Sequence, residues 1–279
     1  GWIDAHVHIT WSFGPDGRNE GMYGTAQGAQ YRWASNAFVT LMAGFTTVQS
    51  VGSLNDIPLR DAIAKGILPG PRILTSSDAL VGQGEASGTP EDIRAFVRKQ
   101  KEAGADLIKI YASQSIRDGG GMSLSLEQLN AACDEARKLG LRSLVHAYKQ
   151  TVHVVTQVGC SQVEHGTMAT DDDLKLLAKN GTYFDPQAGL VLENYLLYRD
   201  RYIGTPGYTP EGFAAMEKAT APLPLPLAPE VMLSQASLLV AVQLQPADVV
   251  TLALPEPATA AGFSEVGDTV NVQGSGAAA

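Results

Sequence analysis

Short apolar runs and amphipathic segments alternate along residues 1–220. The runs are rich in Val, Ile and Leu, whereas the segments between them repeat apolar residues at helical spacing. This alternation is typical of parallel strands joined by helical crossovers, and it predicts an α/β fold. The predicted strands are 3–8, 45–49, 72–76, 106–111, 142–147, 161–165 and 182–186.

Three of the predicted helices have recognisable ends. Thr89, Ser125 and Thr170 each stand in front of a helical segment, and an acidic or amide residue three positions later completes a capping pattern. Gly140 and Gly181 follow the second and third of these helices as stop signals. Seven strand–helix units in this order predict a TIM-like (β/α)8 barrel in which an eighth unit is expected.

The composition changes after Lys218. Residues 219–279 contain no Lys, Arg or His but hold seven of the fifteen prolines. Within them, 221–229 alternates proline with apolar residues, which excludes a central strand or a helix interior and predicts an extended linker. We therefore expect a barrel domain at 1–220 and an atypical C-terminal segment at 221–279.

Three features are predicted beyond this linker. Residues 231–244 are apolar enough for a buried helix, and 248–254 is typical of a strand. The small residues at 274–279 predict a frayed tail.

Length and charge restrict the class of protein. A chain of 279 residues with 44% hydrophobic residues can bury one large core, and a formal charge of −9 disfavours nucleic acid or an anionic membrane as partner. The acidic charge makes a small-molecule or dipeptide substrate the better expectation. Neither a membrane-spanning run nor a basic leader is visible. Cys133 and Cys160 lie in apolar helical contexts where buried free thiols are expected, and the sequence does not decide the compartment.

Four of the five histidines lie at the ends of predicted strands. His6 and His8 occupy alternate positions and so project from the same side of the first strand. His146 and His165 end the fifth and sixth strands. Polar residues at the end of a short apolar run are the simpler reading of a lone His-x-His, but imidazoles that meet at one barrel rim are typical zinc ligands. His153 lies in a predicted helix, and we interpret it as structural or surface-exposed.

Lys109 lies between two isoleucines in the fourth predicted strand. Burial there would lower the pKa of the ammonium and favour the neutral amine. A neutral amine can add carbon dioxide to give a carbamate, whose two oxygens are able to bridge two metal ions. The alternative is a lysine at the rim with its ammonium in water.

Several motifs together resemble the metal-dependent amidohydrolase superfamily. They are the segments 1–8, 44–50, 104–113, 146–148 and 164–167. The sequence is most similar to the branch of prolidase-like and Xaa-Xaa carboxypeptidase enzymes, which is related to imidazolonepropionase. The resemblance extends from the start of the chain to about Lys218.

This resemblance implies cleavage of an amide bond, in a dipeptide or N-acyl amino acid, at a binuclear centre that is usually zinc. His6 and His8 would hold one divalent metal ion, and His146 and His165 would hold the other. Lys109, carrying carbon dioxide as a carbamate, would bridge them. A hydroxide between the metals would attack the carbonyl that one metal polarises.

Two features bear on the substrate. Tyr148 is a candidate catalytic residue that donates a hydrogen bond to the substrate carboxylate or to the developing oxyanion, and packing on the barrel rim is the alternative. Residues 186–212 carry four tyrosines and are predicted to be mostly helical. Their aromatic face would lie in the core, at a subunit contact of a homo-oligomer, or over the substrate as a lid.

The sequence departs from the superfamily in two ways. The N-terminal β-sandwich segment is missing, and no Gly-Thr-Asp-Ala motif identifies the eighth strand and its metal-binding aspartate. Asp248 and Asp268 are the candidates in the last stretch, and neither is assigned to the site. Loss of this carboxylate leaves open a catalytically impaired barrel that binds metal or ligand, or a sequence altered or shortened after Lys218. A metal-free lyase or isomerase is disfavoured, because no helix begins directly after the glycine cluster 119–121.

Overall fold

The computed structural model describes residues 1–21, 26–85, 87–187 and 191–220, together with four short strands between residues 232 and 272. The chain divides into two compact units, Gly1–Thr220 and Ala221–Ala279. None of the helices in the described ranges is long and apolar enough to cross a membrane.

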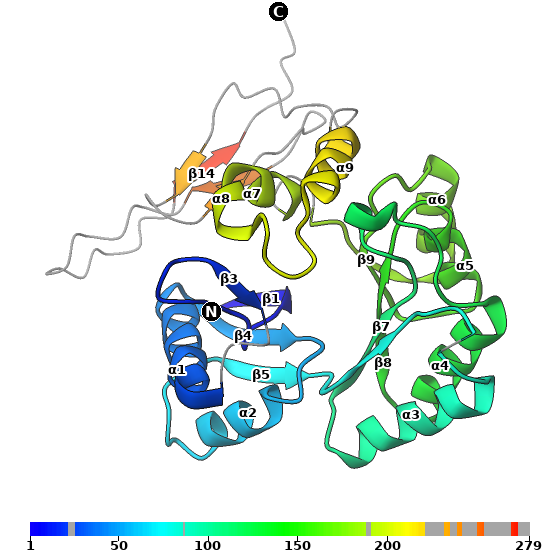
Figure 1. Ribbon diagram of the computed structural model, residues 1–279, viewed down its shortest axis with the longest axis horizontal. Coiled ribbons are helices and arrows are strands. Elements are labelled where there is room, and N and C mark those ends of the chain that lie inside the picture. The colour runs from blue at the N-terminus through cyan, green and yellow to red at the C-terminus, as the bar shows by residue number, and fades with distance from the viewer. Residues whose placement is uncertain are drawn as a thin grey trace, which may run out of the picture. The chain divides into compact units, whose positions relative to one another are not determined.

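Parallel strands form the framework of the first unit, as the alternation of elements predicts (Figure 1). Each of the seven predicted strands is confirmed, and each strand end lies within one residue of the predicted position. One sheet has the order β1 (Trp2–Val7), β4 (Phe45–Ser50), β5 (Arg72–Thr75). The other has the order β10 (Tyr183–Asp185), β9 (Gln162–His165), β8 (Arg142–Ala147), β7 (Leu107–Tyr111), β6 (Ala79–Val81).

The strand β6 was not predicted from the sequence. It follows β5 after a break of three residues, in which Ser77 has a left-handed backbone with φ of 56°. Because of this break, β5 pairs with β4 whereas β6 pairs with β7. Counted this way, β5 and β6 share one position between β4 and β7, and the described strands of this unit fill seven positions. In the described ranges β1 pairs only with β4 and β10 only with β9, so no described strand joins these two edges.

Helices follow the strands as expected. Figure 1 shows α3, α4, α5 and α6 on the same face of the larger sheet. The three predicted caps are confirmed, because the side chains of Thr89, Ser125 and Thr170 each accept a hydrogen bond from the backbone N–H three residues later. The helices that accompany the strands are α1 (Ala26–Met42), α2 (Asp56–Ala64), α3 (Pro90–Glu102), α4 (Leu126–Lys138), α5 (Thr151–Gln157) and α6 (Asp171–Asn180).

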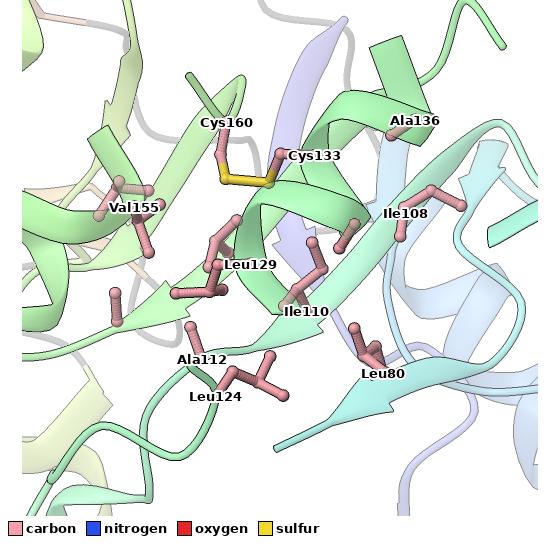
Figure 2. Close-up of a cluster of buried hydrophobic side chains, with 14 of the residues drawn as sticks. Leu80, Ile108, Ile110, Ala112, Leu124, Leu129, Cys133, Ala136, Val155 and Cys160 are labelled. Carbon is pink, nitrogen blue, oxygen red and sulfur yellow. A yellow bond between two sulfur atoms is a disulfide. The ribbon is translucent and has the colours of Figure 1, made fainter. Parts of the chain in front are cut away.

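Strand alternation sorts the side chains of the larger sheet onto two faces. Ile108 and Ile110 of β7 belong to the large apolar cluster between the sheet and helices α3 to α6 (Figure 2). Leu107 lies on the other face, in a small cluster with Leu144 of β8. Lys109 shares the face of Leu107, so the alternation places the lysine inside the strand array.

The two cysteines form a disulfide, so the prediction of free thiols is wrong (Figure 2). Both are buried as expected. Cys133 lies on α4, whereas Cys160 lies in the loop between α5 and β9 rather than in a helix. Packing of α4 beside the loop brings the two Cα atoms to 5.1 Å, within the range that a disulfide needs. A separation of 27 residues hides this proximity from a reading of the sequence.

Antiparallel pairs make up the described part of the second unit. β11 (Met232–Ser234) pairs with β12 (Leu239–Ala241), so the predicted helix at 231–244 is wrong. Short apolar runs do not distinguish a strand from a buried helix, and here the two runs bond to each other. The strand predicted at 248–254 is confirmed as β13 (Val250–Ala253), which pairs with β14 (Thr269–Val272). The predicted linker and tail, with Asp248 and Asp268, lie outside the described residues.

Candidate functional site

A cavity of about 130 Å³ opens at the carboxyl ends of the parallel strands. Its lining includes all five residues predicted as metal ligands, and Tyr148 also lies on its wall. The five come from four strands or the residues directly after them: His6 and His8 from β1, Lys109 from β7, His146 from β8 and His165 from β9.

The four imidazoles form one cluster. The ring centroid of His6 lies 5.3 Å from that of His8 and 5.2 Å from that of His165, and His146 lies 4.7 Å from His165. Burial, followed by the charge of Lys109, lowers the pKa of His8 and of His146 to about 3. Burial also lowers the pKa of the other two rings well below its usual value. All four rings are therefore neutral at pH 7, the state in which imidazole binds metals.

Lys109 is completely buried, which rules out a rim position in water. Its Nζ lies 3.3 Å from His6 Nε2 and 5.0 Å from the ring centroid of Tyr111. Among the described residues, no carboxylate lies within 4.0 Å of this amine. Burial lowers the pKa of Lys109, because desolvation penalises the ammonium more than the charges of Glu164 and Asp185 favour it.

Two carboxylates beside His6 were not identified from the sequence. Glu164 Oε2 lies 2.6 Å from His6 Nδ1. An ionised Glu164 accepts a hydrogen bond from this nitrogen and leaves the lone pair of Nε2 free on the side of Lys109. Asp185, at the end of β10, completes a group whose potential ligand atoms all lie within 4.8 Å of one another. Burial raises the pKa of the Glu164 carboxyl, and a cation held by the neighbouring imidazoles would lower it again and favour the ionised form.

A signal for Glu164 was present in the sequence. Val163 of β9 packs in the cluster that faces the helices, so the next residue must face the interior. Strict alternation would then turn His165 back toward the helices. His165 instead has a left-handed backbone, with φ of 67°, which interrupts the alternation at the end of the strand and lets its ring join the cavity. Gly166 follows with φ of 60°, and a side chain there would collide with the ring of Phe184.

Orphaned polar atoms test whether a metal fits this site. Among the described residues, His8 Nδ1, His146 Nε2 and Glu164 Oε1 are buried without a hydrogen-bond partner. Such atoms are costly unless they bind something. The imidazole nitrogens in the cavity, together with the carboxylates of Glu164 and Asp185 beside His6, suit zinc and similar divalent ions, so this donor set fits a metal centre.

Aromatic side chains form the outer wall of the cavity. Trp11 stacks on His8 with ring centroids 4.0 Å apart, and Tyr148 meets His146 edge to face at 4.7 Å. Burial raises the pKa of the Tyr148 hydroxyl above its usual range, so this hydroxyl keeps its proton and remains a donor. The wall is completed by residues of η1 (Ile116–Asp118), α7 (Val191–Leu197) and the loop between α8 (Arg199–Tyr202) and α9 (Pro210–Thr220).

The tyrosine-rich segment is mostly helical, as predicted. Tyr195, Tyr202 and Tyr208 have ring centroids about 5 Å apart and pack with Phe213 of α9 in one apolar cluster. Tyr195 and Tyr208 also line the cavity. The segment is therefore both a local core and part of the wall of the site.

His153 lies away from the site, as expected. It is on α5, its Nδ1 lies 3.0 Å from Asp173 Oδ1 of α6, and 44% of its side chain is exposed. It links two helices at the surface of the strand array.

Known proteins share sequence and fold with this chain. Residues 1–201, most of the chain, match the amidohydrolase family. The chain belongs to this family. The resemblance that the sequence motifs indicate is thereby confirmed, and so is the relation to prolidases at the level of structural neighbours.

Relatives of this amidohydrolase include proteins of unknown and of assigned function. An uncharacterized protein of Mycobacterium tuberculosis (strain H37Rv) is 24% identical over 198 residues, which cover 70% of this chain and 51% of the relative. The solved structure of a Xaa-Pro dipeptidase with methionine bound in its active site has a TM-score of 0.65 and 25% identity, covering 79% of this chain and 59% of its own. A candidate prolidase from Bifidobacterium longum has a TM-score of 0.60 and 27% identity, covering 78% and 53%.

The coverage values also show how much of each relative's length the chain matches. The amidohydrolase chain spans about half the length of the curated relatives that it matches. The parallel α/β fold of its first unit is consistent with the TIM-barrel domain of the family.

Proposed function

We propose that this amidohydrolase is a metal-dependent hydrolase that cleaves the amide bond of a dipeptide or an N-acyl amino acid. The observation that carries this proposal is the meeting of four neutral imidazoles and a fully buried lysine in one cavity at the carboxyl ends of parallel strands. Barrel enzymes place their chemistry at this end of the strands.

The proposed metal centre uses the five residues predicted from the sequence. His6 and His8 would hold one divalent ion, and His146 and His165 would hold a second, with zinc the expected metal. Lys109, once its neutral Nζ has added carbon dioxide and released a proton, would supply carbamate oxygens as further ligands to these ions. When bound, such ions would polarise the amide carbonyl and lower the pKa of a water molecule that they bind.

Other residues orient these groups and the substrate. Glu164 fixes the ring of His6, because its carboxylate contacts Nδ1. Tyr148, whose hydroxyl stays protonated, donates a hydrogen bond to the substrate carboxylate or to the developing oxyanion. We expect the complete fold to be a (β/α)8 barrel, in which an eighth strand lies between the unpaired edges of β10 and β1.

The choice of substrate follows the relatives. One structural neighbour is a Xaa-Pro dipeptidase with methionine in its active site, and another is a candidate prolidase. Dipeptides of the Xaa-Pro type are therefore the first compounds to test, followed by N-acyl amino acids.

Metal analysis combined with a hydrolysis assay tests the proposal. The full chain, loaded with zinc in the presence of bicarbonate, should bind two ions and release proline from a Xaa-Pro dipeptide. His146→Ala should lower the bound metal and reduce turnover by about a thousandfold or more, because a metal ligand is lost. His153→Ala is the matched control, since this exposed histidine lies outside the cavity. Failure of the wild-type protein to bind metal would refute the proposal.

The alternative to a hydrolase is a barrel that binds metal or ligand without catalysis. Among the described strands, one edge of β1 and one edge of β10 have no partner strand, and the family's aspartate on an eighth strand is not among the described residues. A catalytically impaired barrel that binds metal or ligand would show two bound ions without turnover of any dipeptide or N-acyl amino acid. The same pair of measurements therefore separates the two functions.

A further inference from the structure

Arg117 is a cation on the cavity wall that the proposed metal centre does not use. It lies on η1, in the loop that follows β7, and it lines the same cavity as His146 and Tyr148. Its Nε is buried without a hydrogen-bond partner in the part of the chain that the structure describes. Within that part, no carboxylate lies within 4.0 Å of its guanidinium nitrogens, whereas Arg32 and Arg94 both pair with acidic residues. A positive charge directed into a cavity without a partner favours an anionic ligand.

Packing holds this guanidinium in place. Its central carbon lies 4.2 Å from the ring centroid of Tyr208 and 5.9 Å from that of Tyr195. The backbone N–H of Arg117 donates to Ser115 Oγ at 3.2 Å. A Cβ at Gly212, in the first turn of α9, would lie 3.2 Å from Arg117 Cβ, so the helix approaches closely there. An arginine stacked on aromatic rings has lost most of its freedom before a ligand arrives, which favours binding.

We propose that Arg117 is a specificity-determining residue that binds the free carboxylate of the substrate. This inference rests on the proposed function and narrows it. Dipeptides and N-acyl amino acids carry an α-carboxylate on the residue that leaves, and a guanidinium can bind this group with two parallel hydrogen bonds. Neutral amides and internal peptide bonds lack the group and would leave the arginine unpaired. The site would therefore select substrates that end in a free α-carboxylate.

The experiment compares a Xaa-Pro dipeptide with its C-terminal amide. In the zinc-loaded full chain, kcat/KM should be about a hundredfold or more higher for the free acid. Arg117→Gln should lower kcat/KM for the acid by about a hundredfold, mainly through KM, and change that for the amide by less than about threefold, so the preference disappears. Arg117→Lys should retain part of the preference, because it keeps the charge but loses the planar fork.

Arg201→Gln is the matched control. Arg201 also lies over aromatic rings, 5.6 Å from the centroid of Phe13 and 5.3 Å from that of Tyr198, but it does not line the cavity. This variant should keep the preference for the acid. Equal rates for acid and amide in the wild type, or an unchanged preference in Arg117→Gln, would overturn the assignment of Arg117.

A binding measurement separates this inference from the proposed function. Calorimetric titration with L-proline and with L-prolinamide needs no turnover. If the wild type hydrolyses neither dipeptide but binds proline and not prolinamide, and Arg117→Gln loses this binding, the hydrolase proposal fails while the carboxylate site stands. If the titration shows equal binding of both compounds, or binding of neither, and the assay shows no preference for the acid, the carboxylate site is refuted.

Discussion

Burial of Lys109 is a cost that the site imposes on the stability of the fold. The amine is fully enclosed, and no carboxylate of the described residues lies within 4.0 Å to compensate an ammonium. We expect Lys109→Met, which keeps the volume and removes the polar atom, to raise the free energy of unfolding of the metal-free protein by about 1 to 3 kcal/mol. The same substitution should lower the number of bound ions.

Urea unfolding and metal analysis check both halves of this prediction. Lys175→Met on α6 is the control, because this lysine is exposed and should change neither quantity. A metal-free Lys109→Met protein that is less stable than the wild type would show that the amine makes a favourable contact, contrary to this argument.

Asp56 is a second buried charge, outside the site. It begins α2, is completely buried, and accepts hydrogen bonds from Thr10 at 2.9 Å and from Thr75 at 3.2 Å. Burial raises the pKa of the Asp56 carboxyl to about 6, although hydrogen bonds from Ser50, Thr10 and Thr75 oppose the shift. Compared with the unfolded chain, the folded protein therefore favours the protonated form of the Asp56 carboxyl.

This shift predicts how stability depends on pH. Because the pKa of Asp56 is higher in the folded chain than in the unfolded one, its favourable contribution is complete below about pH 4 and is lost as the pH rises through about 6. A shift of two units corresponds to about 3 kcal/mol. Relative to the wild type, Asp56→Asn should gain up to that amount between pH 4 and pH 7.5 in urea unfolding. Asp61→Asn, on the exposed side of the same helix, should show no such change, and a pH-independent difference for Asp56→Asn would contradict the prediction.

Strand alternation explains which residues of the site could be predicted. His6, Lys109 and His146 were predicted because each occupies an inward position of a recognisable strand, near its carboxyl end. The position of His165 at a strand end was also predicted, but the left-handed backbone that turns its ring inward was not. Arg117 lies in a loop, where no periodicity indicates which way a side chain points.

Among the secondary-structure elements, the capping boxes contribute measurable stability. Thr170 Oγ1 accepts from the N–H of Asp173 at 3.2 Å, and Asp173 Oδ2 accepts from the N–H of Thr170 at 2.8 Å. Thr170→Ala should lower the free energy of unfolding by about 1 kcal/mol, because it leaves a helix N–H unpaired. Thr170→Ser keeps the acceptor and should stay within about 0.5 kcal/mol of the wild type. Equal losses in the two variants would show that packing of the methyl group, rather than the cap, stabilises α6.

The same local signals explain which helices and strands were predicted correctly and which were not. Caps and apolar runs indicated the strands and helices of residues 1–220 because each element there has both a period and a boundary. The strand β6 was not predicted because only its pairing distinguishes it from β5. After the break, the chain pairs with β7 instead of β4, and the composition of the segment does not show this change. The predicted helix at 231–244 was wrong because two short runs of apolar residues satisfy either structure, and only their pairing distinguishes the two.

For the molecule as a whole, the α/β class could be predicted but the closure of the barrel could not. Class follows from the order of the elements, which the sequence displays. Closure needs a strand that pairs with both β10 and β1, and pairing between distant segments leaves no local signal. The disulfide was missed for the same reason, since its two cysteines meet only after α4 and β9 have packed.

That disulfide should stabilise the first unit as a whole. It joins residues 27 positions apart, and restricting a loop of this length in the unfolded chain contributes about 3.5 kcal/mol on the chain-entropy argument. Cys133→Ala with Cys160→Ala should therefore lower the free energy of unfolding by about that amount, less any change in packing.

Reduction of the wild-type protein supplies a control that does not alter the core. Both sulfurs are buried, so a reductant should act slowly on the folded chain and quickly in urea. If the bond forms, the intact mass without reductant is two hydrogens below that of the reduced chain, and the reduced wild type matches the double alanine variant in stability more closely than it matches the oxidised protein. Equal stability of the oxidised and reduced wild type would mean that the bond adds nothing, and the packing of α4 against the loop before β9 would then have to hold the two segments together without it.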